Sequence, residues 1–140
     1  MKIKIIDYGY TKLPIRAHYN DAGADVHICL HDKETIALWP HESVKIPLGF
    51  GIEVPDGYMA CLFPRSGLSS KGIVCELPPI DSGYRGEIHA VVHNGSDTKQ
   101  LFKNGDRIGQ LVVMPIVIAD FVPELGEDRD DSGFGSTGIQ

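Results

Sequence analysis

Short apolar runs separated by turn-forming residues extend along most of this 140-residue chain. The runs lie at residues 1–8, 26–30, 35–38, 43–54, 58–63, 73–77, 86–93, 100–103 and 108–122. A single helical turn at residues 66–71 is the one helix that we expect. Many short strands at fairly even spacing, with no amphipathic helix, predict an all-β sandwich or barrel. We expect a jelly roll, a form of distorted β-barrel, because it protects strand edges in a compact domain.

The pattern also predicts how the chain is divided. Gly49 and Gly51 indicate a bend or bulge, and Pro-Asp-Gly at 55–57 is a strong turn signal, so we expect residues 43–63 to form a hairpin. From residue 124 the chain becomes rich in glycine and acidic residues. The sequence therefore predicts one β domain over residues 1–123 and a flexible C-terminal arm over residues 124–140.

Charge and cysteine content argue against several classes of function. A net charge of -6 argues against nucleic-acid binding, which requires a wide basic surface. A small phosphate-bearing ligand needs only a local cluster of donors, and a divalent cation would help it bind an acidic protein. No apolar run is long enough for a membrane span, and the N-terminus has no signal-peptide pattern. Cys29, Cys61 and Cys75 predict free thiols in a reducing cytoplasm.

The stretch Ile80–Ile88, with the sequence IDSGYRGEI, carries the most distinctive chemistry in the chain. Its Ser-Gly pair is typical of a turn, and alternation after Gly86 indicates a strand. One interpretation is a site in which Asp81 handles a proton, Tyr84 offers a flat apolar face and Arg85 meets an anion. The alternative is a polar hairpin in which Asp81 caps a turn and pairs with Arg85.

Three further places carry candidate site residues. Asp25 follows a small-residue stretch and could approach Mg²⁺ through water, or could simply begin a strand. Arg65, Ser66 and Gly67 open the expected helical turn and could hold phosphate, or could be an ordinary cap with a surface arginine. Gln110 precedes a buried strand and could orient water or a phosphate oxygen, or could satisfy backbone groups at the strand end.

The C-terminal tail contains one aromatic ring among glycines and hydroxyl groups. Its candidate ligand contacts are Arg129, Phe134, Gly135, Ser136 and Thr137. Consecutive backbone N–H groups can enclose phosphates while an aromatic ring covers a base. The alternative is a disordered terminus.

The histidines are not expected to bind metal. His27 and His31, like His89 and His93, are four residues apart on strands, and no Cys or Glu stands at zinc-ligand spacing. We interpret them as surface or core residues.

Five motifs occur in a fixed order: AGAD at 22–25, PRSG at 64–67, IDSGYRGE at 80–87, GDRIGQ at 105–110 and RDDSGFGSTG at 129–138. Together they resemble the trimeric deoxyuridine triphosphatase family over residues 21–138. The resemblance implies a jelly-roll homotrimer with active sites between subunits. It also implies Mg²⁺-dependent hydrolysis of dUTP to dUMP and pyrophosphate, which removes dUTP from the nucleotide pool and supplies dUMP for thymidylate synthesis.

The resemblance also implies a role for each candidate residue. Asp81 would deprotonate the attacking water, and Tyr84 would pack under the deoxyribose. Phosphates would be held by Arg65, Ser66 and Gly67, with Gln110 placing the water or a phosphate and Asp25 near the water shell of Mg²⁺. The tail would come from a neighbouring subunit, with Phe134 over the uracil and Arg129, Gly135, Ser136 and Thr137 around the β- and γ-phosphates.

Pro78 departs from the family pattern, which often has glycine at this position. The resemblance implies that uracil is read there largely by backbone groups, and proline has no N–H to donate. Deoxycytidine triphosphate deaminases share the fold, but their catalytic Glu corresponds to Val91 here, which cannot transfer a proton. The second alternative is a nucleotide-binding module that signals through a protein partner.

Overall fold

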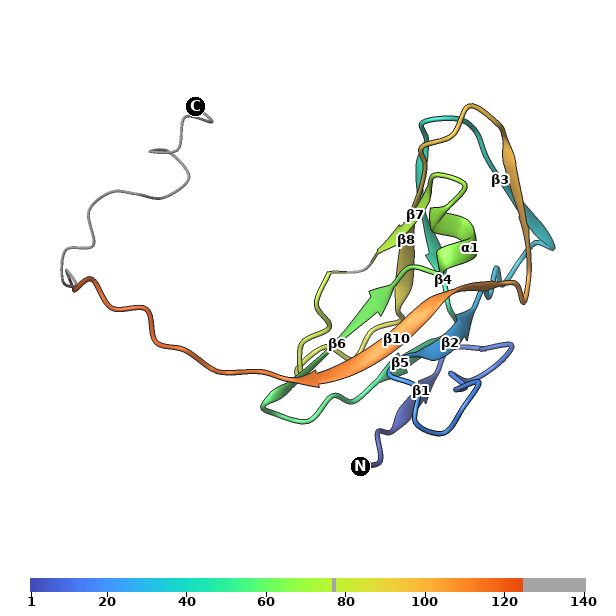
Figure 1. Cartoon of the computed structure of the whole chain (residues 1–140). Helices are drawn as coiled ribbons and strands as arrows, with labels where there is room; N and C mark the ends of the chain where they lie inside the picture. The colour runs from blue at the N-terminus through green and yellow to red at the C-terminus, as the bar shows by residue number, and fades with distance from the viewer. Residues whose placement is uncertain (77, 125–140) are drawn as a thin grey trace, which may run out of the picture.

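A computed structural model describes residues 1–76 and 78–124 of the chain. These residues form strands and one short helix (Figure 1). The elements are β1 (Ile5–Asp7), β2 (Ala24–His27), β3 (Thr35–Leu38), β4 (Ser43–Pro47), β5 (Phe50–Ile52), β6 (Tyr58–Phe63), α1 (Ser66–Ser69), β7 (Ile73–Glu76), β8 (His89–Asn94), β9 (Gln100–Lys103) and β10 (Arg107–Pro115). The all-β class predicted from the sequence is confirmed, whereas the jelly-roll form remains a prediction.

All of the strand pairs in the described residues are antiparallel. The longest strand, β10, lies between β2 and β6, and β8 lies between β4 and β7. Two smaller pairs, β1 with β5 and β3 with β9, complete the arrangement. Most partners are far apart in sequence, so the sheets bring together the motifs that the sequence separates.

The strands enclose one continuous apolar core. Along β8 every second residue is buried, which is the period of a strand with one face inward. In β5 all three residues are buried: Phe50 and Ile52 belong to the core, and Gly51 lies under the backbone of Arg85 and Gly86. The largest fully buried side chains include Phe50, Ile28, Leu38, Ile46 and Leu48.

The predicted hairpin over residues 43–63 is wrong. The turn after residue 54 forms as expected, with the Tyr58 amide donating to the Pro55 carbonyl at 3.2 Å. However, β4 pairs with β8, β5 with β1 and β6 with β10. Gly49, at φ +81°, separates β4 from β5 and redirects the chain. The turn therefore connects strands of two different sheets.

The cysteines are free thiols, as the sequence predicted. Cys29 and Cys75 are buried, and Cys61 is half-buried. Burial raises the pKa of the Cys75 thiol to about 12, with a smaller contribution from Glu76. The Cys75 thiol is therefore protonated at neutral pH and acts as a small apolar core residue.

Residues 116–124 run away from the β body after β10 ends at Pro115 (Figure 1). The segment is apolar, yet Val117 is 87% exposed and Phe121 is 95% exposed. The predicted arm lies mainly in residues 125–140, outside the described part of the chain. Within that part, the short α1 is the one helix, and no helix could span a membrane.

Candidate active site

A pocket of about 280 Å³ opens beside the stretch 80–88 that the sequence singled out. It is lined by Lys45, Pro78, Pro79, Ile80, Asp81, Tyr84, Glu87, Ile88, His89 and Val91. Asp81 and Tyr84 are therefore brought to one cavity, as the sequence predicted. Pro78 and Pro79 form part of its wall, so the departure from the glycine pattern leaves a pocket in place.

The backbone of Asp81 is held at the pocket by the strand-paired residue before it and by the turn after it. The preceding Ile80 is buried and exchanges two backbone hydrogen bonds with Ala60 of β6, at 2.7 and 3.2 Å. The Tyr84 amide then donates to the Asp81 carbonyl at 3.1 Å, which closes the turn. Asp81 is exposed, and its backbone is held by hydrogen bonds both before and after it in the chain.

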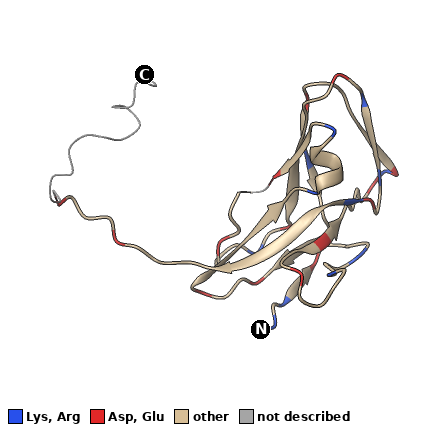
Figure 2. Cartoon of the chain, in the orientation of Figure 1, with Lys and Arg blue, Asp and Glu red and all other residues tan. Residues whose placement is uncertain are grey.

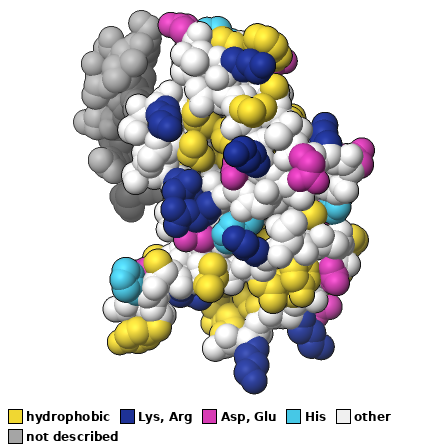
Figure 3. Space-filling model, turned by 90° about the vertical axis from the view of Figure 1, so that its right-hand side faces the viewer, with side chains coloured by type: hydrophobic (Ala, Val, Ile, Leu, Met, Phe, Trp, Pro, Cys, Tyr) yellow, Lys and Arg dark blue, Asp and Glu magenta, His cyan; other side chains and the backbone are white. Residues whose placement is uncertain are grey.

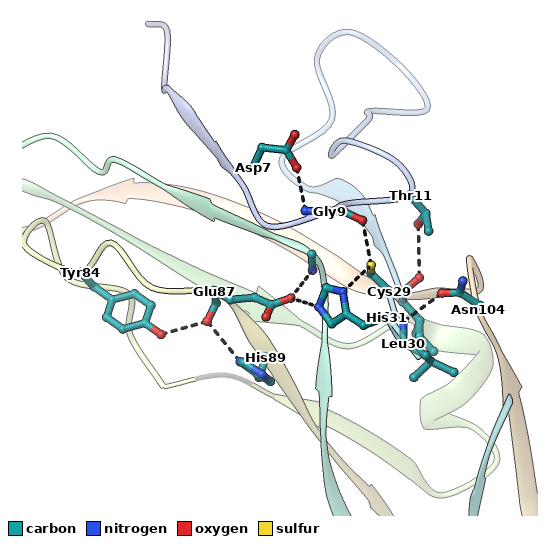
Figure 4. A network of polar contacts seen from close by, with 12 residues as sticks. Asp7, Gly9, Thr11, Cys29, Leu30, His31, Tyr84, Glu87, His89 and Asn104 are labelled. Atoms are coloured by element: carbon teal, nitrogen blue, oxygen red, sulfur yellow. Dashed lines mark hydrogen bonds and ion pairs between the residues drawn. The ribbon is translucent and has the colours of Figure 1, made fainter. Parts of the chain in front are cut away.

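Tyr84 is held through its hydroxyl, which donates to the Glu87 carbonyl at 2.9 Å (Figure 4). A Cβ atom on Gly86 would lie 2.5 Å from the Tyr84 hydroxyl oxygen, so this ring position requires glycine at residue 86. The side chain is still 47% exposed. A fixed ring with an accessible surface is suited to packing against a sugar or a base.

Arg85 does not line this pocket. Its Nη1 atom donates to the carbonyls of Ser82, at 2.6 Å, and Tyr84, at 3.1 Å, while Nε lies 3.7 Å from a Glu53 carboxylate oxygen. Arg85 therefore does not pair with Asp81, as one sequence interpretation had it, whereas its contact with a bound anion stays a prediction. Arg85 instead stabilises the turn that carries Asp81.

A second group of candidate residues gathers where β10 lies between β2 and β6. Gln110 is in register with Asp25 of β2 on one side and Phe63 of β6 on the other. Arg107 Nη1 lies 3.1 Å from Asp25 Oδ2, and Arg65 Nη1 donates to the Arg107 carbonyl at 3.2 Å. We call Asp25, Arg65, Arg107 and Gln110 the basic cluster. The sequence motifs at 22–25, 64–67 and 105–110 therefore converge at one place.

Close packing explains the small residues before Asp25. A Cβ atom on Gly23 would lie 2.7 Å from Gln110 Oε1 and 2.8 Å from Gln110 Cβ, so only glycine leaves room for this side chain. Figure 2 shows an acidic residue within β2, and this residue is Asp25, since β2 contains no other acid.

Ser66 and Gly67 lie at the start of α1, next to the basic cluster. Both residues are exposed, and a Cβ atom on Gly67 would meet nothing within 4 Å. The first amides of a helix have no acceptor within the helix. Together with the Arg65 side chain, these amides and the Ser66 hydroxyl can donate to an anion.

The charge around the basic cluster is locally positive although the whole chain is acidic. Burial lowers the pKa of His27, and the charges of Lys12, Arg107 and Arg65 lower it further against the opposing effect of Asp25. The His27 Nδ1 atom is buried without a hydrogen-bond partner. On the face shown in Figure 3, Lys and Arg side chains lie along the middle of the molecule. An anion would therefore be attracted here.

The pocket and the basic cluster are separate in one chain. Among residues 1–76 and 78–124, no hydrogen bond or ion pair joins Asp81 or Tyr84 to a member of the basic cluster. The tail candidates Arg129, Phe134, Gly135, Ser136 and Thr137 lie outside the described residues. Within those residues, no group of three or more His, Cys, Asp or Glu side chains could hold a metal.

The described residues form an all-β domain with a carboxylate and a tyrosine in one pocket and a separate positively charged cluster. This combination is typical of an enzyme that hydrolyses nucleotide phosphates. Comparison with known proteins identifies the family. Residues 9–138 match the family model for dUTPase, so the chain belongs to the dUTPase family.

Relatives and solved structures agree with this assignment. The chain is 41% identical to a deoxyuridine 5'-triphosphate nucleotidohydrolase of Bifidobacterium longum subsp. infantis, over 98% of this chain and 89% of the relative. It is 42% identical to the Leifsonia xyli enzyme of the same name, over 91% and 86% of the two chains.

Two phage structures share the fold. The dUTPase of Staphylococcus bacteriophage 80alpha, solved with dUPNHPP, aligns with a TM-score of 0.77 at 29% identity and covers 99% of both chains. Phage dUTPases of this kind control transfer of virulence genes by a proto-oncogenic G protein-like mechanism. A mutant dUTPase from phage phi11 of S. aureus, which coordinates a structural Mg(II) ion, aligns with a TM-score of 0.74 at 26% identity over 94% and 99% of the two chains.

Proposed function

We propose that this protein is a dUTP diphosphatase that hydrolyses dUTP to dUMP and pyrophosphate. The observation that carries the proposal is the joint presence of Asp81 and Tyr84 in one pocket of a chain whose residues 9–138 match the dUTPase family. The reaction removes dUTP from the nucleotide pool and supplies dUMP for thymidylate synthesis.

Asp81 is the general base in this mechanism. Its exposed carboxylate takes a proton from a water molecule as the water oxygen bonds to the α-phosphorus. The bond between the α-phosphorus and the bridging oxygen to the β-phosphate breaks, and that oxygen leaves with pyrophosphate. Because the Asp81 backbone is fixed through Ile80 and through the turn, the base is held at a defined place in the pocket.

Tyr84 selects the sugar. Its ring packs under the deoxyribose, where a 2′-hydroxyl would collide with it. The hydrogen bond from its own hydroxyl to Glu87 keeps the ring from yielding to a larger ribose. This gives deoxynucleotides an advantage in both binding and turnover.

The phosphates are bound by Arg65, Ser66 and Gly67, and Gln110 orients the attacking water or a phosphate oxygen. This assignment is supported by the positive charge around the basic cluster and by the exposure of the first residues of α1. Gln110 is suited to its role because its amide can both donate and accept.

The enzyme is proposed to be a homotrimer with each active site shared between subunits. In one chain no polar contact of the described residues joins the pocket to the basic cluster, and this separation supports a site that a second copy completes. The exposed apolar side chains of residues 116–122 also require a cover that the described part of the chain does not provide. The tail of a neighbouring subunit would add Arg129, Phe134, Gly135, Ser136 and Thr137.

Mg²⁺ is the proposed cofactor, and the residues present suit a metal that arrives with the triphosphate. Mg²⁺ usually keeps several waters and binds through one or two carboxylates plus phosphate oxygens, without an all-protein cage. The Asp25 carboxylate is mostly buried and oriented by Arg107, so it can accept from the metal's water shell. When bound, the ion would neutralise phosphate charge and fix the triphosphate conformation.

Deamination of dCTP is not proposed, because Val91 lines the pocket at the position where that reaction needs a carboxylate. A cytoplasmic location is supported by the three free cysteines.

The test is pyrophosphate release from dUTP, dCTP, dTTP and UTP in parallel with Mg²⁺, with ammonia followed in the dCTP sample. Release from dUTP alone is expected. Ammonia from dCTP would place the chain with the deaminases. Binding of dUTP without release from any nucleotide would favour the alternative of a nucleotide-binding module that acts through a partner.

A further inference from the structure

His31 and Glu87 form a contact that none of the roles above uses. His31 Nε2 lies 2.6 Å from Glu87 Oε2, and the two residues are 56 positions apart in the chain (Figure 4). His31 follows β2, whereas Glu87 lines the pocket beside Asp81 and Tyr84. The contact therefore ties a loop outside the pocket directly to the segment that carries the proposed base and sugar contact.

The Glu87 carboxylate is fixed by a second partner. The Gly49 amide donates to the same Oε2 atom at 2.9 Å. Gly49 is closely packed, because a Cβ atom there would lie 2.6 Å from Tyr10 Cα and 2.8 Å from the Cys29 sulfur. The side chain of Glu87 is only 18% exposed, so both donors approach it in a partly desolvated environment where hydrogen bonds are stronger.

The backbone of the same residue holds Tyr84. The Glu87 carbonyl accepts from the Tyr84 hydroxyl at 2.9 Å and lies 3.2 Å from His89 Nδ1. A change in the backbone orientation of Glu87 would therefore move the acceptor of the Tyr84 hydroxyl. The contacts of the Glu87 carboxylate with Gly49 and His31 oppose such a rotation, because they fix the end of the Glu87 side chain.

His31 adopts a backbone conformation that L-residues seldom use, with φ at 60°. Such a conformation costs free energy and persists only where surrounding contacts hold it. The Leu30 amide donates to Asn104 Oδ1 at 2.9 Å, and the Cys29 sulfur lies 3.1 Å from the Gly9 carbonyl and 3.6 Å from His31 Nδ1. These contacts keep the loop in place and aim the ring at Glu87.

We propose that His31 and Glu87 are positioning residues that set the orientation of the Tyr84 ring and so determine discrimination between deoxyribose and ribose. The proposal rests on the proposed function, in which Tyr84 packs under the sugar. It predicts that removing the His31 ring weakens sugar selection and leaves the chemical step on dUTP largely intact, because Asp81 is anchored separately through Ile80 and Ala60.

The chain offers a matched pair of substitutions for the test. His31 and His41 are the two non-glycine residues with positive φ in the described part of the chain, at 60° and 66°. Glycine suits this conformation at both positions, so His31→Gly and His41→Gly each remove a ring at the same backbone geometry. His41 is a surface residue whose nearest charged partner, Asp97, is 3.5 Å away and lies outside the pocket.

The measurement is the ratio of kcat/KM for dUTP to kcat/KM for UTP in the full-length protein. In His31→Gly this ratio should fall roughly fivefold, which corresponds to the loss of one hydrogen bond. The kcat for dUTP should stay within about twofold of wild type. In His41→Gly the ratio stays at the wild-type value. An unchanged ratio in a folded His31→Gly protein would overturn the proposal.

Glu87→Gln provides a conservative partner variant. Its amide oxygen can still accept from Gly49 and His31, so it should keep more discrimination than Glu87→Ala, in which both donors lose their acceptor. If His31→Gly adds nothing further to Glu87→Ala, the two residues act as one unit. Full additivity would contradict their coupling.

A binding measurement separates failure of this proposal from failure of the proposed function. If the wild-type protein releases no pyrophosphate from dUTP, the proposed function fails. The relative affinities for non-hydrolysable dUTP and UTP analogues, measured by calorimetry, still test the positioning role. Equal selectivity in the wild type and His31→Gly would refute the positioning role on its own.

Discussion

The pocket segment 80–88 and the short helix α1 contribute to the same proposed reaction but are built differently. In the pocket segment, Ile80 is paired to β6, Tyr84 is bonded to Glu87, and Glu87 is held by Gly49 and His31. The helix α1 has no buried residue and no side-chain cap. Among residues 1–76 and 78–124, the side chain of Arg65, just before it, makes a single hydrogen bond of 3.2 Å, to the Arg107 carbonyl.

The difference follows from the interactions that each region has to make. Exclusion of a 2′-hydroxyl depends on van der Waals contact, which changes within a fraction of an ångström. Proton transfer likewise requires the base within hydrogen-bond reach of the water. Attraction between a guanidinium and a triphosphate falls off slowly with distance. A site can therefore tolerate a simple scaffold for charge recognition but needs a fixed one for sugar selection and base catalysis.

The largest expected effect comes from the base in the fixed region. Asp81→Asn should lower kcat by roughly 10²–10⁴-fold, the range typical of general-base catalysis. Affinity for a non-hydrolysable dUTP analogue should remain, because the shape of the pocket is kept. Stopped-flow pyrophosphate assays and calorimetry would measure the two quantities. The control is Asp97→Asn, which alters an aspartate that does not line the pocket. Full turnover in Asp81→Asn would remove Asp81 from the mechanism.

A smaller effect is expected from the charge-recognising region. Arg65→Ala should raise KM for dUTP by roughly 10–100-fold, the usual cost of losing a charged hydrogen bond. Arg65→Lys should recover much of this loss, since a charge remains although the planar fork is gone. Steady-state kinetics on both variants would test the comparison directly. If KM for dUTP rises as much in Arg65→Lys as in Arg65→Ala, phosphate binding at Arg65 depends on the geometry of the guanidinium and not only on its charge.

The sequence predicted the elements of this fold better than their partners. The strands at 35–38, 58–63 and 100–103 have the bounds expected, because turn residues mark both ends. Strand pairing could not be predicted in the same way. The apolar residues at 50 and 52 indicate a strand there but not that β5 pairs with β1, far away in the sequence.

The same limit applies to the site. Asp81 and Tyr84 could be predicted as neighbours because only Ser82 and Gly83 separate them on one turn. His31 was interpreted as a surface or core residue, since nothing in the local sequence indicates a contact with Glu87. The one available signal is chemical: histidine is among the few residues that tolerate positive φ at a loop position. The pairing of Arg85 with Asp81 was wrong, because the partners of Arg85 are carbonyls of its own turn and Glu53 of a distant segment.

A pair of glycine substitutions tests how tightly the fixed region holds Tyr84. In Gly86→Ala the new Cβ would lie 2.5 Å from the Tyr84 hydroxyl oxygen, so the ring must move. We expect discrimination against UTP to fall roughly tenfold, somewhat more than the loss of one hydrogen bond. In Gly83→Ala the new Cβ meets nothing within 4 Å, so discrimination should be kept. Equal behaviour of the two variants would show that the position of Tyr84 does not govern sugar selection.

The smallest expected effect concerns stability near the basic cluster. The pKa of His27 is lowered in the folded protein, first by burial and then by Lys12, with Arg107 and Arg65 acting in the same direction. The unfolded chain therefore binds a proton at His27 more readily than the folded chain. Stability should fall as the pH is lowered from above the usual histidine pKa of about 6.5 towards the lower folded value.

His27→Gln should flatten this part of the pH profile, measured by urea unfolding at closely spaced pH values. Arg65→Gln should weaken the pH dependence slightly, because it removes one of the charges that oppose protonation. A profile that His27→Gln leaves unchanged would show that neither burial nor the nearby positive charges lower the pKa of His27 on folding.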